Sequence, residues 1–184
     1  LTADTTLTLN EITISAIKQD VNPLHSSTAN THIKGRDIEK LNIVSSKNIS
    51  EIAPNLHIPD YGSRITSSIY VRGMGTRIDQ PVVGMNIDNI PVMDKNNYDF
   101  DIADIARIEM LRGPQSTLFG RNTMGGLINI YTISPLTYQG VRLLAEHSSG
   151  NSYKASASVY HKFSTKFGAS ITAQYTSSDG FFTN

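Results

Sequence analysis

The sequence contains no cysteine among its 184 residues, which excludes disulfides and thiolate metal sites. Its 16 basic and 16 acidic residues give a formal net charge of zero, so it lacks the basic character expected of a nucleic-acid-binding protein. No apolar run approaches the roughly 18 residues of a transmembrane helix. No signal peptide is visible and the chain starts with Leu1 rather than Met, so we expect a mature or trimmed segment.

Residues that could carry catalysis are scattered rather than grouped. The five histidines, at positions 25, 32, 57, 147 and 161, include no pair spaced for a helical metal site. The glycines around Met74 and at 125–126 lack a full phosphate-loop fingerprint, and Ser116 has no adjacent base. The sequence therefore predicts no enzyme, no cofactor and no metal site.

Hydrophobic residues make up 39% of the chain, enough for a packed core, and they gather around residues 107–133. Two apolar segments there flank a turn that starts at Gly113-Pro114 and contains further glycines. On spacing alone this is a buried strand–loop–strand unit of any α+β domain.

The residues of this unit are more specific than their spacing. The run RIEMLRGPQSTLFGRNTMGGLINI at 107–130 resembles the end of the plug domain of TonB-dependent outer-membrane receptors, which carry IEVLRGP, LYG and GGVIN. Residues 69–75 resemble the IRGxG motif of that family, and 86–91 resemble VDGVP with Asn89 in place of glycine. Asn tolerates the left-handed conformation, so the turn can survive the exchange. The resemblance covers roughly residues 10–135.

Local patterns upstream predict a small mixed sheet with short helices, an α+β fold. We expect short helices within 35–56, capped by Ser46 and ended by Pro54, and a strand at 65–72. A hairpin should join 82–87 to 90–92, and a helical turn at 101–105 should lead into the central unit.

The pattern changes after Pro135, where apolar and small polar residues alternate. The alternation is strict at 167–175, clear at 153–160 and less regular at 141–146. Transmembrane β-strands need about 9–11 residues with one apolar face, but strands of a soluble sheet alternate in the same way. After a plug, we expect the first antiparallel strands of a transmembrane β-barrel. Because barrels begin at about 8 strands, the natural protein should be longer.

The resemblance implies three regions. Residues 1–20 are expected to be a flexible N-terminal segment with a possible TonB box, 21–135 the plug, and 136–184 the first strands of a truncated barrel. It implies a transport receptor in the outer membrane of a Gram-negative bacterium, in contact with lipid through its barrel. The plug is expected to gate the barrel and to help bind a scarce external ligand. The resemblance favours a ferric siderophore and leaves cobalamin, haem and glycans open, because specificity lies mostly in barrel loops that this segment does not contain. The alternative is a soluble periplasmic or surface binding module with no barrel.

The resemblance also implies residues for three contacts. An alternating segment resembles the TonB box, which pairs with TonB by strand addition; an ordinary edge strand would look the same. That segment consists of Glu11, Ile12, Thr13, Ile14 and Ser15. The plug loops expected to face the ligand contain Tyr61, Arg64, Arg77, Gln80, Asn97 and Tyr98.

The third contact is a latch between plug and barrel wall, formed by Arg72, Glu109 and Arg112. Both arginines precede a glycine and are expected to pair with carboxylates of the wall that this segment does not contain. Glu109 lies three residues before Arg112, so the two should project to opposite faces of a strand. The alternative is that the arginines are ordinary surface charges beside turns.

Overall fold

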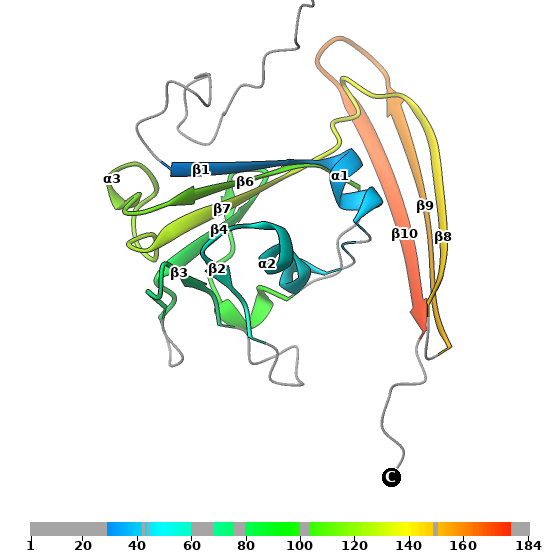
Figure 1. The fold of residues 1–184 in the computed structure, drawn as a ribbon. Coiled ribbons are helices and arrows are strands. Elements are labelled where there is room, and N and C mark those ends of the chain that lie inside the picture. The colour runs from blue at the N-terminus through cyan, green and yellow to red at the C-terminus, as the bar shows by residue number, and fades with distance from the viewer. Residues whose placement is uncertain are drawn as a thin grey trace, which may run out of the picture.

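The computed structural model describes residues 29–41, 43, 45–59, 68–75, 80–99, 104–148 and 151–177. The predicted TonB-binding segment, Glu11 to Ser15, lies outside these residues, as do Tyr61, Arg64 and Arg77. The described chain forms a five-stranded sheet with short helices and, beside it, a three-stranded sheet (Figure 1). No helix in this part of the chain is long and apolar enough to cross a membrane.

The five-stranded sheet is mixed, as the sequence predicts. Its order is β1-β6-β7-β4-β5, and only the β4–β7 pair is parallel. The strands are β1 (Ala29–Lys34), β4 (Val83–Ile87), β5 (Ile90–Pro91), β6 (Ile105–Arg112) and β7 (Gly126–Thr132). The predicted strand–loop–strand unit is thus the β6–β7 pair, and β1 is an edge strand of the sheet.

One face of this sheet carries the main core. Ile108 and Met110 of β6, Ile128 of β7 and Met85 of β4 are almost completely buried there. Each such side chain contributes roughly 1.5–3 kcal/mol through burial. Leu111 and Leu127 form a smaller cluster against Phe119. Because strand side chains alternate between the two faces, one set points into this core. The buried residues of β6 and β7 belong to the same run that carries the family resemblance.

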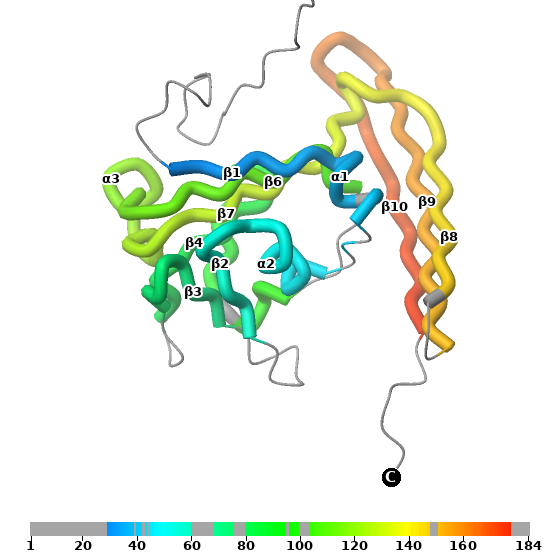
Figure 2. Tube along the Cα trace, viewed as in Figure 1, coloured from blue at the N-terminus to red at the C-terminus, as the bar shows by residue number. Residues whose placement is uncertain are grey.

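Short helices complete this part of the chain, residues 29–132, which we call the plug body after the resemblance described above. They are α1 (Gly35–Lys40), η2 (Ser46–Asn48), α2 (Ile49–Ile52), η3 (Lys95–Asn97) and α3 (Ser116–Phe119), and the two-stranded sheet consists of β2 (Leu56–His57) and β3 (Tyr70–Val71). Figure 2 shows α1 at the end of the sheet nearest the three-stranded sheet. Gly35 is required there, because a Cβ would lie 2.5 Å from the Ile105 carbonyl oxygen.

Three local predictions differ from the structure. The capping residue is Ser45, which forms a capping box with Asn48, whereas the Ser46 hydroxyl donates to the Tyr98 carbonyl. Only residues 68–72 of the predicted strand at 65–72 are among the described residues, and of these only 70–71 pair with another strand, β2. The predicted helical turn before the central unit is wrong at its end, because Asp104 is left-handed (φ +53°) and β6 begins at Ile105.

The hairpin turn is confirmed. Asp88 and Asn89, between β4 and β5, both have positive φ (48° and 68°). Asp and Asn tolerate this conformation better than other non-glycine residues, so the exchange of glycine for Asn89 keeps the turn.

The three-stranded sheet is antiparallel and follows the predicted alternation. Its strands are β8 (Gly140–Ser148), β9 (Ser152–Lys162) and β10 (Gly168–Ser177), in the order β8-β9-β10. Leu143 and Ile171 lie on its apolar face and are 78% and 76% exposed, whereas Ser158 on the polar face is 1% exposed. The polar face is therefore the one that contacts the plug body.

Candidate functional site

The predicted latch residue Glu109 is buried, and its partner comes from the same strand. The Arg107 Nε donates to a Glu109 carboxylate oxygen at 2.7 Å, because residues two apart on β6 share a face. The Arg107 guanidinium also lies over the Tyr131 ring, 3.9 Å from its centroid. The two-residue spacing of Arg107 and Glu109 could indicate this ion pair from the sequence, but Arg107 is not among the predicted site residues.

Arg112 has two partners inside the plug. Its two Nη atoms donate to the backbone carbonyls of Pro54 (3.0 Å) and Asn30 (2.9 Å). Arg72 is exposed, sits in the left-handed region (φ 52°), and donates its backbone N–H to the Asn55 carbonyl. The two arginines that look alike in sequence therefore occupy different environments, and their pairing with carboxylates of a wall that this segment does not contain stays a prediction.

The predicted ligand-facing loop residues divide into exposed and buried ones. Gln80 and Asn97 are exposed, and their role in facing the ligand stays a prediction. Tyr98 is only 2% exposed, and its hydroxyl donates to the Val83 carbonyl at 3.2 Å. Burial raises the pKa of Tyr98 to about 12. Tyr98 is thus a core residue, and its assignment to the ligand-facing loops is corrected.

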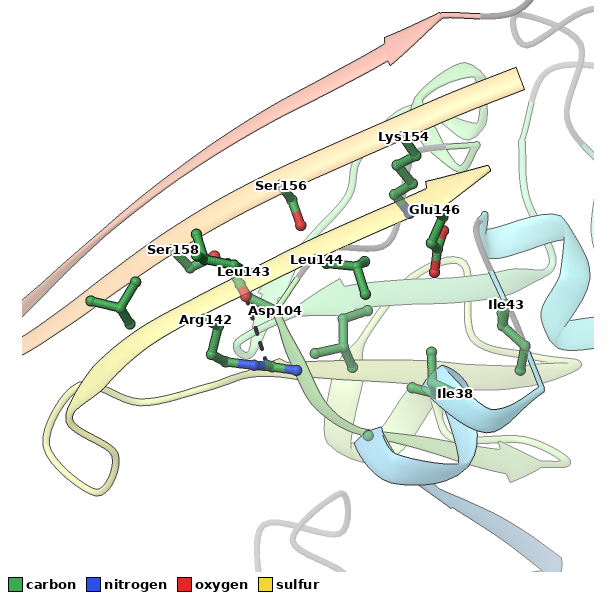
Figure 3. A pocket seen from close by; sticks show the side chains of 13 residues that line it. Ile38, Ile43, Asp104, Arg142, Leu143, Leu144, Glu146, Lys154, Ser156 and Ser158 are labelled. Carbon is green, nitrogen blue, oxygen red and sulfur yellow. Dashed lines mark hydrogen bonds and ion pairs between the residues drawn. The ribbon is translucent and has the colours of Figure 1, made fainter. Parts of the chain in front are cut away.

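The contact between the plug and the three-stranded sheet centres on Asp104, a residue that no sequence motif indicates. Its carboxylate accepts hydrogen bonds from the Ser158 and Thr172 hydroxyls and lies 3.7 Å from the Arg142 guanidinium. Arg142, Ser158 and Thr172 are cross-strand neighbours on β8, β9 and β10. One carboxylate of the plug therefore contacts a single row across all three strands, and Figure 3 shows Asp104 pointing at Arg142.

The electrostatics of Asp104 favour its ionised form. Burial alone would raise the pKa of this carboxyl, but hydrogen bonds from Ser158 and Thr172 and the positive charge of Arg142 outweigh it. The pKa of Asp104 therefore lies below its ordinary value. The left-handed backbone directly before β6 directs this side chain at the sheet, and Asp is one of the residue types that tolerate that conformation.

A pocket of about 390 Å³ lies beside Asp104, between α1 and the three-stranded sheet. Its plug side is apolar, with Ile38 and Ile43, while Glu146, Lys154 and Ser156 line the sheet side (Figure 3). Within the described ranges, no three His, Cys, Asp or Glu side chains could together hold a metal. The pocket therefore has a mixed lining, and the polar groups around Asp104 lie at its edge.

Comparison with known proteins places this geometry in a known context. A family model described as the TonB-dependent Receptor Plug Domain matches residues 23–127. The pesticin receptor of Yersinia enterocolitica is 30% identical over 112 residues, which are 60% of this chain and 16% of that receptor. The vitamin B12 transporter BtuB of Vibrio vulnificus is 25% identical over 140 residues, 70% of this chain and 21% of that protein.

Solved structures agree with the sequence comparison. The ferric yersiniabactin uptake receptor FyuA from Yersinia pestis superposes with a TM-score of 0.72 at 26% identity, covering 81% of this chain and 24% of that one. The ferripyoverdine receptor of the outer membrane of Pseudomonas aeruginosa gives 0.74 at 18% identity, covering 89% and 22%. The second likeness shows the fold alone. The chain spans about a fifth of the length of these curated relatives.

Proposed function

Because the chain belongs to the family of TonB-dependent receptor plug domains, we propose that it is the gating part of an outer-membrane transport receptor. The family comprises transporters rather than enzymes, and relatives carry names such as pesticin receptor and vitamin B12 transporter. In this proposal the plug body occludes a β-barrel whose first strands are β8, β9 and β10.

The observation that carries the proposal is the polar contact at Asp104. A plug that must both hold and release needs an interface whose hydrogen bonds water can replace. Hydroxyl and guanidinium donors around one carboxylate meet that need, because water-mediated hydrogen bonds are nearly as favourable as direct ones. An apolar interface of the same extent would resist separation more strongly.

The outward face of the three-stranded sheet supports a membrane position. Exposed Phe163 and Phe167 lie at one end of the β9–β10 hairpin, while exposed Tyr153 and Tyr175 lie at the other. Ten residues separate Tyr153 from Phe163, about 33 Å along a strand at about 3.3 Å per residue. A tilt of about 40° reduces this to about 25 Å, the height of the apolar band of outer-membrane barrels. A soluble binding module would expose this face to water.

The partners follow from the family. TonB would pair with residues 11–15 by strand addition, which uses main-chain hydrogen bonds. The external ligand would be a ferric siderophore, a choice supported by the likeness to FyuA at 26% identity. Cations at Arg64 and Arg77 suit an anionic iron chelate, and exposed Gln80 and Asn97 would add polar contacts. Matches to vitamin B12 transporters keep cobalamin as the competing ligand.

Uptake of radioactive iron as a ferric siderophore by cells that carry the full-length receptor tests this function. Ile14→Pro should abolish TonB-dependent uptake and leave surface binding of the chelate intact, because proline removes a donor and fixes φ. Thr6→Pro, outside the alternating segment, serves as the matched control and should transport normally. Normal uptake by the Ile14→Pro receptor would reject the TonB assignment, and uptake of labelled cobalamin alone would reject the siderophore.

A further inference from the structure

The turn between β9 and β10, at the top of Figure 1, brings aromatic rings together at one end of the three-stranded sheet. Phe163 and Phe167 are each 62% exposed, and their ring centroids lie 5.4 Å apart. The backbone N–H groups of Phe163 and Ser164 both donate to the Phe167 carbonyl, so the turn holds the two rings in place. The His161 ring packs edge-on against Phe163, with centroids 4.5 Å apart. Alternation along β9 and β10 puts these rings on the apolar face, which points away from the plug.

The charges on this hairpin have one sign. Between Glu146 and Asp179 the sequence contains three lysines and neither aspartate nor glutamate. Lys162 and Lys166 flank the turn, and in the described part of the chain neither forms an ion pair. Lys154 lies near the other end of β9, in register with Glu146 of β8. The positive charge of the hairpin is therefore concentrated at the turn.

The tip of the turn adds hydroxyl groups to this charge. Ser164, Thr165 and Lys166 are all exposed. The Lys166 backbone N–H donates to the Ser164 hydroxyl oxygen at 3.2 Å, and the hydroxyl can still donate its own proton outward. One ammonium and two hydroxyls on three consecutive residues can donate together to a single phosphate group, because a lysine binds phosphate as a point charge.

We infer that this turn binds the phosphate headgroup of an anionic phospholipid, with Lys166 on the phosphate and the rings of Phe163 and Phe167 beside the acyl chains. The inference rests on the proposed function, which places the outward face of the sheet against lipid. Aromatic rings collect at both interfaces of a membrane, but only basic residues add attraction for anionic lipids. The end with Tyr153 and Tyr175 has rings without such lysines, so the two ends of the sheet should differ in the lipid that they prefer.

Photo-crosslinking of the full-length receptor in phosphatidylcholine vesicles tests this site. A trace of photoactivatable phosphatidylglycerol should label residues 161–167 more strongly than the same amount of photoactivatable phosphatidylcholine. Around Tyr153 and Tyr175 the two lipids should label equally. Lys166→Gln should lower labelling of 161–167 by phosphatidylglycerol about fivefold, because one lysine near a membrane surface contributes about that factor. High salt should lower this labelling as well.

Lys154→Gln is the matched control, because it removes a lysine of the same hairpin at the end far from the turn. It should keep the wild-type labelling of 161–167. Equal labelling of 161–167 by the two lipids, or by phosphatidylglycerol in wild type and Lys166→Gln, would overturn the headgroup site. Displacement of the lipid by soluble glycerol 3-phosphate would also overturn it, because the turn would then bind free phosphate.

The same labelling separates this inference from the proposed function. Absence of labelling by either lipid anywhere on residues 153–175 would reject the membrane position of the sheet, and with it the proposed function. Labelling by both lipids alike would reject the headgroup site alone and leave that position standing.

Discussion

At the scale of single residues, the partners of the charged side chains could not be predicted from the sequence motifs. The buried Glu109 is held by Arg107 on the same strand, and Arg112 is held by backbone carbonyls. The contact with the neighbouring sheet instead uses a plug carboxylate, Asp104, against hydroxyls and one arginine. This contact is separate from the predicted latch between plug arginines and wall carboxylates, which stays a prediction.

Replacing Asp104 by Asn should weaken the contact between the plug and the three-stranded sheet. It should also remove the pH dependence of this contact. Loss of the charge should cost about 1–3 kcal/mol of plug attachment at neutral pH, because hydrogen bonds to a charged acceptor are the stronger ones. Since the folded pKa of Asp104 is lowered, its contribution is complete above the unfolded value of about 3.9 and is lost as pH falls through the folded value.

Amide exchange at the start of β6, corrected for intrinsic rates, measures this attachment between neutral and acid pH. Wild type should lose protection on acidification, whereas Asp104→Asn should be weak throughout and insensitive to pH. Asp94→Asn is the control, because Asp94 is an exposed carboxylate that accepts a local hydrogen bond from the backbone N–H of Asn96. Identical pH profiles for wild type and Asp104→Asn would rule out Asp104 as the attachment point.

At the scale of elements, the alternation of apolar and polar residues is sufficient to predict a strand wherever the apolar residues mark one face. The β6–β7 unit, the β4–β5 hairpin and the three strands after Pro135 all follow their patterns. β1 was missed because Ile33 is its only buried residue, so its strand form depends on pairing with β6. Asp104 was missed because its role depends on a row of residues that only the register of three strands brings together.

Tyr98 shows how a polar neighbourhood can hide a core residue. η3 ends at Asn97 and is followed by Tyr98, whose ring enters the core. Tyr98→Phe should cost about 1 kcal/mol, since the Val83 carbonyl loses its donor, and should leave ligand affinity unchanged. Urea titration of plug exchange and equilibrium binding of the ligand to the full-length receptor measure the two effects. A weaker affinity without loss of stability would return Tyr98 to the ligand-facing loops.

At the scale of the whole molecule, two bodies with different surfaces meet along a polar contact. The plug body has its own core, and the three-stranded sheet turns its apolar face away from the plug. This division matches the two sequence patterns of the chain, a compact α+β pattern followed by alternating strands. It also leads to the central claim, that the plug body closes a pore formed by a barrel that starts at β8.

Single-channel conductance in a planar bilayer tests that claim most directly. The full-length receptor should show no steady conductance, because the plug fills the pore. A receptor that lacks residues 29–132 but retains all strands from β8 onward should insert and conduct steadily, with a large current in each opening. Inserted receptor that conducts equally little with and without the plug would contradict the account.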